Sequence, residues 1–161
     1  MKENLSEADK LYYANLPRKI VGAGAIFFNS IGELLIVKPT YKDGWSIPGG
    51  AVELNESPRE GCIREVKEEI GLDIYIKKLL VLDYRAKDDD SLQFIFLGGT
   101  LDVQQIANIK LQESELSEYK FVSTDDAIAN YLRSNLAGRT PACLKAIRTG
   151  KCYYLEGSKE I

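Results

Sequence analysis

Three glutamates in one short stretch of the chain have the residue type and spacing of a site for a hard cation. Glu65 lies three residues before Glu68 and four before Glu69, so in a helix all three carboxylates project from neighbouring positions on one side. Such carboxylates repel one another, and either solvent or a bound cation relieves the repulsion. Most charge runs of this kind are a solvated face, so these residues alone leave both interpretations open.

The segment around the glutamates predicts a helix over residues 57–70. Ser57 is a good N-cap, Pro58 suits the first helical position, and Glu60 completes a capping box. Gly71 is a typical C-terminal stop. The apolar positions that recur at spacings of three and four are Ile63, Val66 and Ile70. One helix is therefore expected to carry a core face and an acidic face.

Two adjacent glycines precede this helix at a fixed distance from its charged residues. Gly49 and Gly50 allow the backbone to approach a ligand or a metal without an intervening Cβ. Five residues separate Gly50 from Glu56, and seven more separate Glu56 from Arg64. The glycines, Glu56 and Arg64 are therefore expected to belong to the same site as the glutamates.

The whole pattern resembles the Nudix box, a motif that restricts nine positions at set spacing. All nine are matched, by Gly50, Glu56, Arg64, Glu65, Val66, Glu68, Glu69, Gly71 and Leu72. The resemblance extends over about residues 18–133, and with the preceding run 45–49 it is far more specific than a lone glycine motif. It implies an α/β fold of the Nudix type, which is an α/β/α sandwich with a mixed, mainly antiparallel sheet.

The resemblance implies that the box holds a divalent metal against a diphosphate. Glu65, Glu68 and Glu69 would be metal ligands, some of them through water, and the carbonyl of Gly49 would be another. Mg²⁺, with Mn²⁺ as the alternative, suits such a set because it prefers oxygen ligands and keeps several waters. The metal would neutralise the diphosphate and activate the attacking water.

The general base has more than one candidate. In the family it is a glutamate of the box or an acid on a later loop. Glu115 stands six residues before Phe121 and is the first choice on that loop, with Glu113 second. The alternative is that both are solvated loop acids. Arg64 is expected to orient a carboxylate by a charge-assisted hydrogen bond. The expected catalytic set is Glu65, Glu68, Glu115 and Arg64.

Residues on the substrate side are predicted from charge and aromatic character. The basic residues that could meet phosphates are Arg18, Lys38, Lys42 and Arg85, although such a residue is more often an ordinary surface charge. Tyr41 and Tyr84 could stack on a base. Glu56 is expected to anchor the loop before the helix, and it is also a candidate to lie close to the bound group.

The resemblance implies the class of reaction and leaves the substrate to residues outside the box. The implied activity is magnesium-dependent hydrolysis of a nucleoside diphosphate linked to another group. Strings typical of members that act on NADH or coenzyme A are absent, and no proline lies between Pro58 and Pro141, where many ADP-ribose hydrolases have one. A (d)NTP or a modified nucleotide is therefore the first candidate. The alternatives are a non-catalytic nucleotide-sensing Nudix module and an isomerase on the same scaffold.

The composition excludes several other classes of protein. The 161 residues contain no histidine, which excludes a Ser-His-Asp triad and a histidine-based zinc site. Three scattered cysteines without a CxxC pair favour a reducing, cytoplasmic location. A formal net charge of −3 does not favour binding to a nucleic-acid polymer, which is itself strongly negative. No apolar run approaches the roughly 20 residues that cross a bilayer. The expected partner is a small nucleotide-diphosphate substrate, with no membrane; a homodimer is left open.

The rest of the chain is expected to fold around the acidic helix as one domain, residues 1–161. Strands are expected over 20–29, 33–37, 72–84, 92–101, 119–122 and 153–155, and further helices over 123–133 and 140–149. Residues 104–117 are polar and are expected to form a loop. Residues 1–17 form an N-terminal extension with a short helix over 6–16 packed on the domain, and 134–161 form a C-terminal helix and tail. This order predicts a mixed sheet with helices on both faces.

Overall fold

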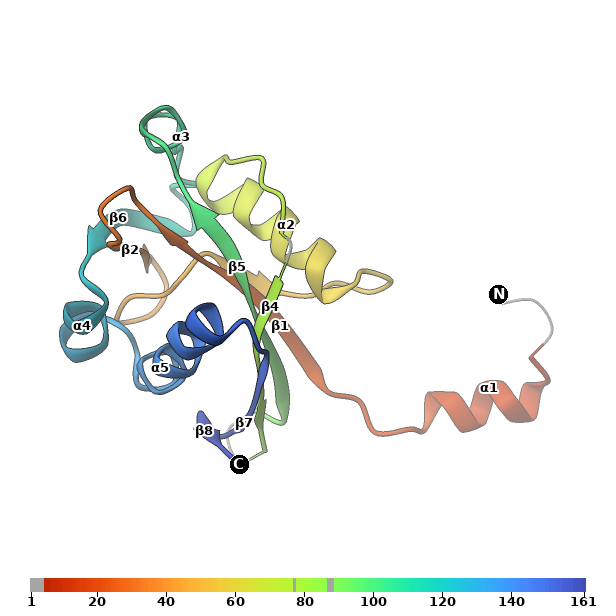
Figure 1. The fold of residues 1–161 in the computed structure, drawn as a ribbon. Helices are drawn as coiled ribbons and strands as arrows, with labels where there is room; N and C mark the ends of the chain where they lie inside the picture. Colours follow the sequence, from red (N-terminus) through yellow and green to blue (C-terminus); the bar gives the residue numbers. More distant parts are fainter. Residues whose placement is uncertain (1–4, 77, 87–88) are drawn as a thin grey trace.

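A computed structural model describes residues 5–76, 78–86 and 89–161. In chain order its elements are α1 (Glu7–Ala14), β1 (Ile20–Phe28), β2 (Leu34–Pro39), β3 (Gly49–Ala51), α2 (Pro58–Ile70), β4 (Lys78–Arg85), β5 (Ser91–Thr100), α3 (Val103–Ala107), β6 (Leu116–Val122), α4 (Thr124–Asp126), the π-helical turn η1 (Ala127–Tyr131), α5 (Ser134–Thr149), β7 (Tyr153–Glu156) and β8 (Lys159–Glu160). Helix α2 covers one face of an eight-stranded sheet and α5 covers the other (Figure 1). The expected α/β/α sandwich is therefore confirmed.

Strand β1 lies in the middle of the sheet and pairs with three other strands. The order is β6-β2-β1-β5-β4-β7-β8, and β3 pairs with β1 off this path. Among the described residues, β1 runs parallel to β5 and β4 parallel to β7, whereas the other pairings are antiparallel. The register places Gly24 opposite Gly49 and Ala23 opposite Gly50. The short glycine strand is thereby fixed against the centre of the sheet.

Alternation along the strands divides the core into two layers, because successive side chains of a strand point to opposite faces. Leu34 and Ile36 pack in the layer that contains α5 and η1, whereas Leu35 and Val37 pack in the layer that contains α2. All four are fully buried. Each helix is thus held on the sheet by its own apolar layer.

Helix α2 begins and ends as its sequence predicts. The hydroxyl of Ser57 accepts a hydrogen bond from the Glu60 amide, and the Glu60 carboxylate accepts one from the Ser57 amide, which forms the capping box. Gly71 ends the helix in the left-handed region, at φ 75°. Val66 and Ile70 are fully buried against the sheet. Glu69, on an adjoining side of the helix, is buried as well.

Several boundaries outside α2 differ from the sequence prediction. Residues 72–76 are not a strand, and β4 begins only at Lys78. The expected loop over 104–117 contains α3, which is capped by Asp102. The expected helix over 123–133 is a single α-helical turn followed by η1. Helix α5 begins at Ser134 rather than residue 140, and Pro141 sits on its exposed side, where it cannot donate to the carbonyl of Ala137.

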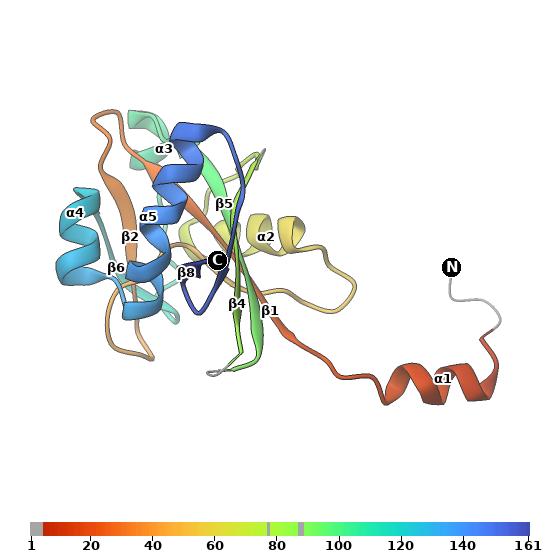
Figure 2. The same cartoon turned by 60° about the horizontal axis from the view of Figure 1, so that its bottom comes forward.

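Helix α1 does not pack on the rest of the chain, so that expectation is wrong. It projects away from the body in both views (Figures 1 and 2), and none of its residues is buried. Leu11, Tyr12 and Tyr13 are consecutive, so they point to different sides of the helix and form no single apolar stripe. The helix is stabilised locally by a capping box between Ser6 and Asp9. In the described part of the chain, no helix combines the length and apolar character of a membrane span.

Candidate active site

Glycine is required at two positions of β3 because the acids of α2 and the centre of the sheet lie against its backbone. Gly49 adopts φ 140°, and a Cβ there would overlap the backbone of Ala23 and Gly24. Its amide donates to Oε2 of Glu69 over 2.7 Å. A Cβ on Gly50 would lie 2.5 Å from Oε2 of Glu65. The two glycines therefore allow two carboxylates of α2 to reach the strand.

Arg64 is the centre of the hydrogen-bond network on α2. Its Nε and Nη2 donate to the two carboxylate oxygens of Glu56, over 2.9 and 3.1 Å, and Nη2 also donates to the Ala51 carbonyl over 2.9 Å. Its Nη1 donates to Oε1 of Glu65 and to Oε2 of Glu68, each over 2.9 Å. Charge-assisted bonds of this kind fix both partners. Arg64 therefore ties the loop before the helix to two of the three clustered glutamates.

The buried acids of this site are hard to ionise without a cation. The pKa of Glu69 is raised to about 8, mainly by burial and also by the nearby carboxylates of Glu65 and Glu115, although the hydrogen bond from the Gly49 amide and the charge of Lys42 act in the opposite direction. Burial also raises the pKa of Glu65 above its ordinary value, against the effect of Arg64. A bound divalent cation would favour both ionised forms.

The loop before β6 brings a further acid to the cluster. The amide of Gln112 donates to the Glu69 carbonyl and the Lys110 amide donates to the Ile70 carbonyl, each over 3.0 Å. The carbonyl of Glu115 accepts a hydrogen bond from Thr40 over 2.8 Å. The loop is thus fastened both to the end of α2 and to the residue after β2. Its acid, Glu115, is close enough for its charge to raise the pKa of Glu65 and Glu69.

The carboxylates fit a hard divalent metal by their chemistry, although they are not yet gathered around one point. Among the described residues, no three acidic or cysteine side chains converge as a ligand set. Glu65 and Glu69 are nevertheless largely buried oxygen donors beside the glycine strand. Glu68 has a side chain that is 51% exposed, and it accepts a hydrogen bond from Arg64. Because Mg²⁺ keeps several waters, it does not require three direct carboxylate bonds.

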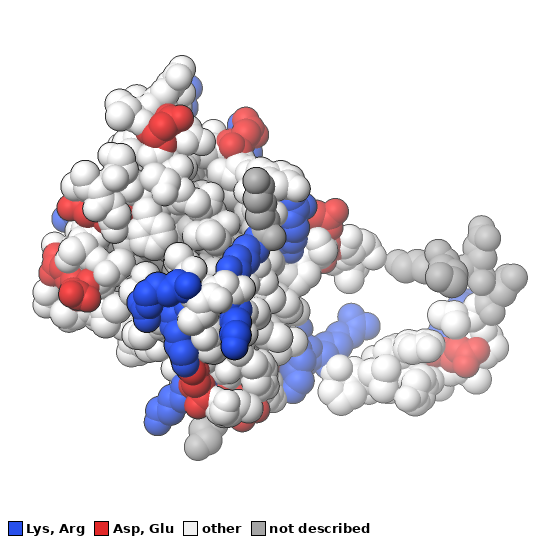
Figure 3. All heavy atoms as spheres, in the orientation of Figure 1, with Lys and Arg blue, Asp and Glu red and all other residues white. Residues whose placement is uncertain are grey.

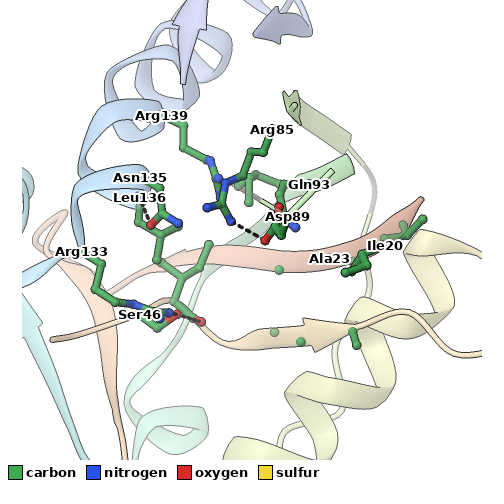
Figure 4. Close-up of a pocket in the computed structure, with 18 of the residues that line it drawn as sticks. Ile20, Ala23, Ser46, Arg85, Asp89, Gln93, Arg133, Asn135, Leu136 and Arg139 are labelled. Carbon is green, nitrogen blue, oxygen red and sulfur yellow. Dashed lines mark hydrogen bonds and ion pairs between the residues drawn. The ribbon is translucent and has the colours of Figure 1, made fainter. Parts of the chain in front are cut away.

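A cavity of about 520 Å³ extends from the glycine strand across the sheet to α5 (Figure 4). Gly49 and Gly50 line it on one side, with Tyr41 and Lys42 beside them. Its polar wall includes the side chains of Arg85, Asp89, Gln93, Arg133, Asn135 and Arg139. The volume is in the range of small-molecule sites. A ligand that reached the acids through the glycine strand could place its remaining part in this cavity.

A family model for the NUDIX domain matches residues 18–143. The chain belongs to the Nudix family. Solved structures agree with this assignment. A MutT protein from Methanosarcina mazei Go1 is 25% identical, with a TM-score of 0.67 over 85% of this chain and 99% of that one. An ADP-ribose pyrophosphatase from Streptococcus suis 89-1591 is 24% identical, with a TM-score of 0.68 over 86% of this chain and 99% of that one, and it supports the fold alone.

Curated relatives of this Nudix chain carry the names of hydrolases. The m7GpppN-mRNA hydrolase of Saccharomyces cerevisiae (strain ATCC 204508 / S288c) is 29% identical over 119 residues, which are 72% of this chain and 12% of that protein. The RNA pyrophosphohydrolase of Hydrogenovibrio crunogenus is 44% identical over 50 residues, which are 31% of this chain and 30% of that protein. This chain thus spans less than a third of either relative's length. Nudix hydrolases generally use divalent metal ions.

The residues predicted for the substrate side of this Nudix fold are scattered. Those that line the cavity are Tyr41, Lys42 and Arg85. Glu56 is bound to Arg64. The other three do not line it. Arg18 is exposed, and the hydroxyl of Tyr84 donates to Asp90 over 2.8 Å. Lys38 lines a second pocket, which shares Tyr41 and Lys42 with the cavity.

Of the residues on the polar wall of the cavity, sequence reasoning named only Arg85. Arg133, Asn135 and Arg139 come from the segment around α5, and Asp89 and Gln93 come from the β4–β5 hairpin. They lie far from the box in sequence, so box spacing gives no sign of them. The available signal was a charged residue, Arg139, among small and apolar residues at 136–144.

Proposed function

We propose that this Nudix protein is a magnesium-dependent hydrolase of a nucleoside diphosphate linked to another group, with a (d)NTP or a modified nucleotide as its first candidate substrate. The observation that carries the proposal is the position of Glu65 and Glu69. They are largely buried acids beside the glycine strand, and the same strand lines a cavity large enough for the rest of a nucleotide.

The proposed roles follow from the contacts of each side chain. Glu65 and Glu69 would hold the metal, with Glu68 and the Gly49 carbonyl as further ligands, some of them through water. The metal would neutralise the diphosphate and lower the pKa of water. Arg64 would act as a positioning residue, because its contacts orient Glu65 and Glu68.

Glu115 is the first candidate for the general base, because it lies beside the buried acids on a loop that is fastened to α2. It would take a proton from the attacking water, provided that a water lies within roughly 3 Å of its carboxylate in the complex. Glu113, the second candidate, is exposed on the same loop. A glutamate of the box is the remaining candidate for this role.

The alternatives make different predictions. A nucleotide-sensing module would bind nucleotides and release no phosphate, and the unbroken box argues against it. An isomerase would need a reactive group such as Cys62, but burial raises the pKa of that thiol to about 12 and keeps it protonated. A cytoplasmic location and a homodimer stay predictions.

A panel of substrates tests the proposal directly. The purified protein is incubated with Mg²⁺ and nucleotides, sugar nucleotides, dinucleoside polyphosphates and nucleotide cofactors, and the products are identified by chromatography and mass. RNA with a 5′-triphosphate belongs in the panel, because Figure 3 shows lysine and arginine side chains gathered over and beside α5, and because one relative is named as an RNA pyrophosphohydrolase. Activity on RNA alone would contradict the prediction of a small substrate.

Two variants and a matched control test the site. Glu65→Gln and Glu69→Gln are expected to lose most turnover with the fold retained. Glu60→Gln lies on the same helix and keeps its capping box, so it is expected to retain turnover. Wild-type rates in both box variants would contradict the proposal.

A further inference from the structure

Arg139 carries a buried hydrogen-bond donor that no described residue satisfies. The side chain comes from α5 and is 3% exposed. It extends toward the cavity wall formed by Arg85, Asp89 and Gln93 (Figure 4). Its Nη2 has no hydrogen-bond partner in the described part of the chain. An unpaired buried donor is expensive, so this group has a specific reason to be there.

The rest of the Arg139 side chain is held rigidly. Its Nε donates to Oδ2 of Asp83 over 2.9 Å, and Asp83 is completely buried on β4. The amide of Ser158 donates to Oδ1 of Asp83 over 2.9 Å, and the Ser158 hydroxyl donates to Oδ2 over 3.1 Å. Asp83 thus fixes the guanidinium at the cavity wall, and the buried Nη2 of Arg139 is left without a partner among the described residues.

The charges at this end of the cavity are balanced in pairs. Arg139 is paired with Asp83, and Arg85 donates to Asp89 over 3.0 Å. An anionic ligand group would therefore meet little net positive charge here. A neutral acceptor oxygen needs only the free donor and no counter-charge, so the pairing favours a carbonyl over a further phosphate.

The surfaces between the polar groups suit a flat ring. Ile47, Ile95 and Leu136 line the cavity with apolar side chains. Other polar groups stand at its edge. Oδ1 of Asn135 accepts from the Leu136 amide over 2.8 Å, which leaves the amide nitrogen of that side chain for a ligand. The Gln93 side chain lies close over Gly22, where a Cβ would overlap its amide. A heterocycle with a polar edge matches this combination of walls.

We infer that Arg139 is a specificity-determining residue that binds a carbonyl oxygen on the base of the substrate, and that the protein therefore prefers oxo bases to bases without that oxygen. The inference rests on the proposed function, since it assumes that the diphosphate lies at the glycine strand. Asp83 acts as the positioning residue for Arg139.

Matched nucleotides test this inference. Inosine and purine riboside 5′-triphosphates differ by the carbonyl at position 6, and uridine and cytidine 5′-triphosphates differ by a carbonyl in place of an amine. A charged donor to a carbonyl predicts roughly a tenfold to hundredfold preference in kcat/KM for the oxo member of at least one pair. A ratio near one in both pairs overturns the inference.

Arg139→Lys keeps a positive charge beside Asp83 and removes the Nη2 donor. It is expected to reduce the preference to about one by slowing only the oxo nucleotide, whereas an equal loss for both members would indicate a phosphate contact and overturn the inference. Arg148→Lys is the control, because it makes the same change at an exposed position of α5. If Arg139→Lys does not fold, the wild-type ratios decide alone.

Calorimetry separates this inference from the proposed function. The affinity ratio of each nucleotide pair is measured for the wild type with nonhydrolysable analogues in the presence of Mg²⁺, so no turnover is needed. An oxo preference in binding without hydrolysis by the wild type would support the role of Arg139 and contradict the proposed activity. Hydrolysis with no preference for either oxo nucleotide would support the activity and overturn the role of Arg139.

Discussion

Glu69→Gln should stabilise the metal-free protein at alkaline pH although it removes a residue proposed for function. Burial raises the pKa of Glu69 to about 8 in the folded protein, against an ordinary value of 4.5. When folding raises the pKa of an acid, the contribution of that acid to the free energy of unfolding is complete at pH values below its pKa in the unfolded chain. This contribution is lost as the pH rises toward and through its pKa in the folded protein. Between pH 4.5 and about 8, ionisation of Glu69 therefore opposes folding increasingly.

The size of the effect follows from the pKa values. Each pH unit of difference corresponds to about 1.4 kcal/mol, which sets an upper limit of about 5 kcal/mol above pH 8. Water that enters the site lowers this figure, so we expect about 1–3 kcal/mol. The side-chain carbonyl introduced by Glu69→Gln would still accept the hydrogen bond from the Gly49 amide, so little is lost in return. For a chain of this size the gain corresponds to a melting temperature higher by roughly 3–10 °C.

Thermal or urea denaturation without divalent metal, at pH 5 and pH 9, measures the effect. Glu69→Gln should be more stable than the wild type at pH 9, and its advantage should shrink toward pH 5. Glu113→Gln, the same change at an exposed acid, should show no such trend. An advantage that is absent at pH 9, or that is equal at both pH values, would refute the reasoning about burial.

Other variants test the remaining contacts of the site. Gly50→Ala places a methyl group against the Glu65 carboxylate, so turnover should fall at least tenfold while circular dichroism remains that of a folded protein. Glu115→Gln should lower kcat with little change in KM, and an unchanged kcat would remove Glu115 as the base. Arg64→Lys should raise the Mg²⁺ concentration that gives half-maximal activity roughly tenfold to a hundredfold, as expected when the support of metal ligands is lost. An unchanged Mg²⁺ dependence would show that Arg64 does not position the ligands.

The sequence predicted the acidic helix well because its determinants are local. The capping box of Ser57 and Glu60 and the stop at Gly71 lie within a few residues of the ends that they define. The later helices were predicted less well. Helix α5 begins after Arg133, which makes no side-chain cap hydrogen bond, and its first turn is held by packing of Leu136 on the sheet. Pro141 suggested a start near itself. Helix α1 was placed correctly in sequence, but its packing could not follow from local signals.

The residues of the candidate site also fall into those determined by local sequence and those assembled by tertiary structure. The acids and glycines of the box were proposed because their spacing along one turn and one helix matches a known motif. The cavity wall around Arg139 is assembled from α5 and the β4–β5 hairpin, so only tertiary structure brings it together. Arg18, Lys38 and Tyr84 were chosen by residue type alone, and the fold places none of them on the cavity.

Calorimetric titration of the wild type with Mg²⁺ and a nonhydrolysable nucleotide, at pH 7.5 in two buffers of different ionisation enthalpy, tests the metal site most directly. Metal uptake should be accompanied by proton release, because the pKa of Glu69 is about 8 without metal, and Glu69→Gln should lose both the release and most of the affinity. Absence of metal uptake by the wild type, or equal affinity in Glu69→Gln, would contradict the proposal that these carboxylates hold a divalent metal against a diphosphate.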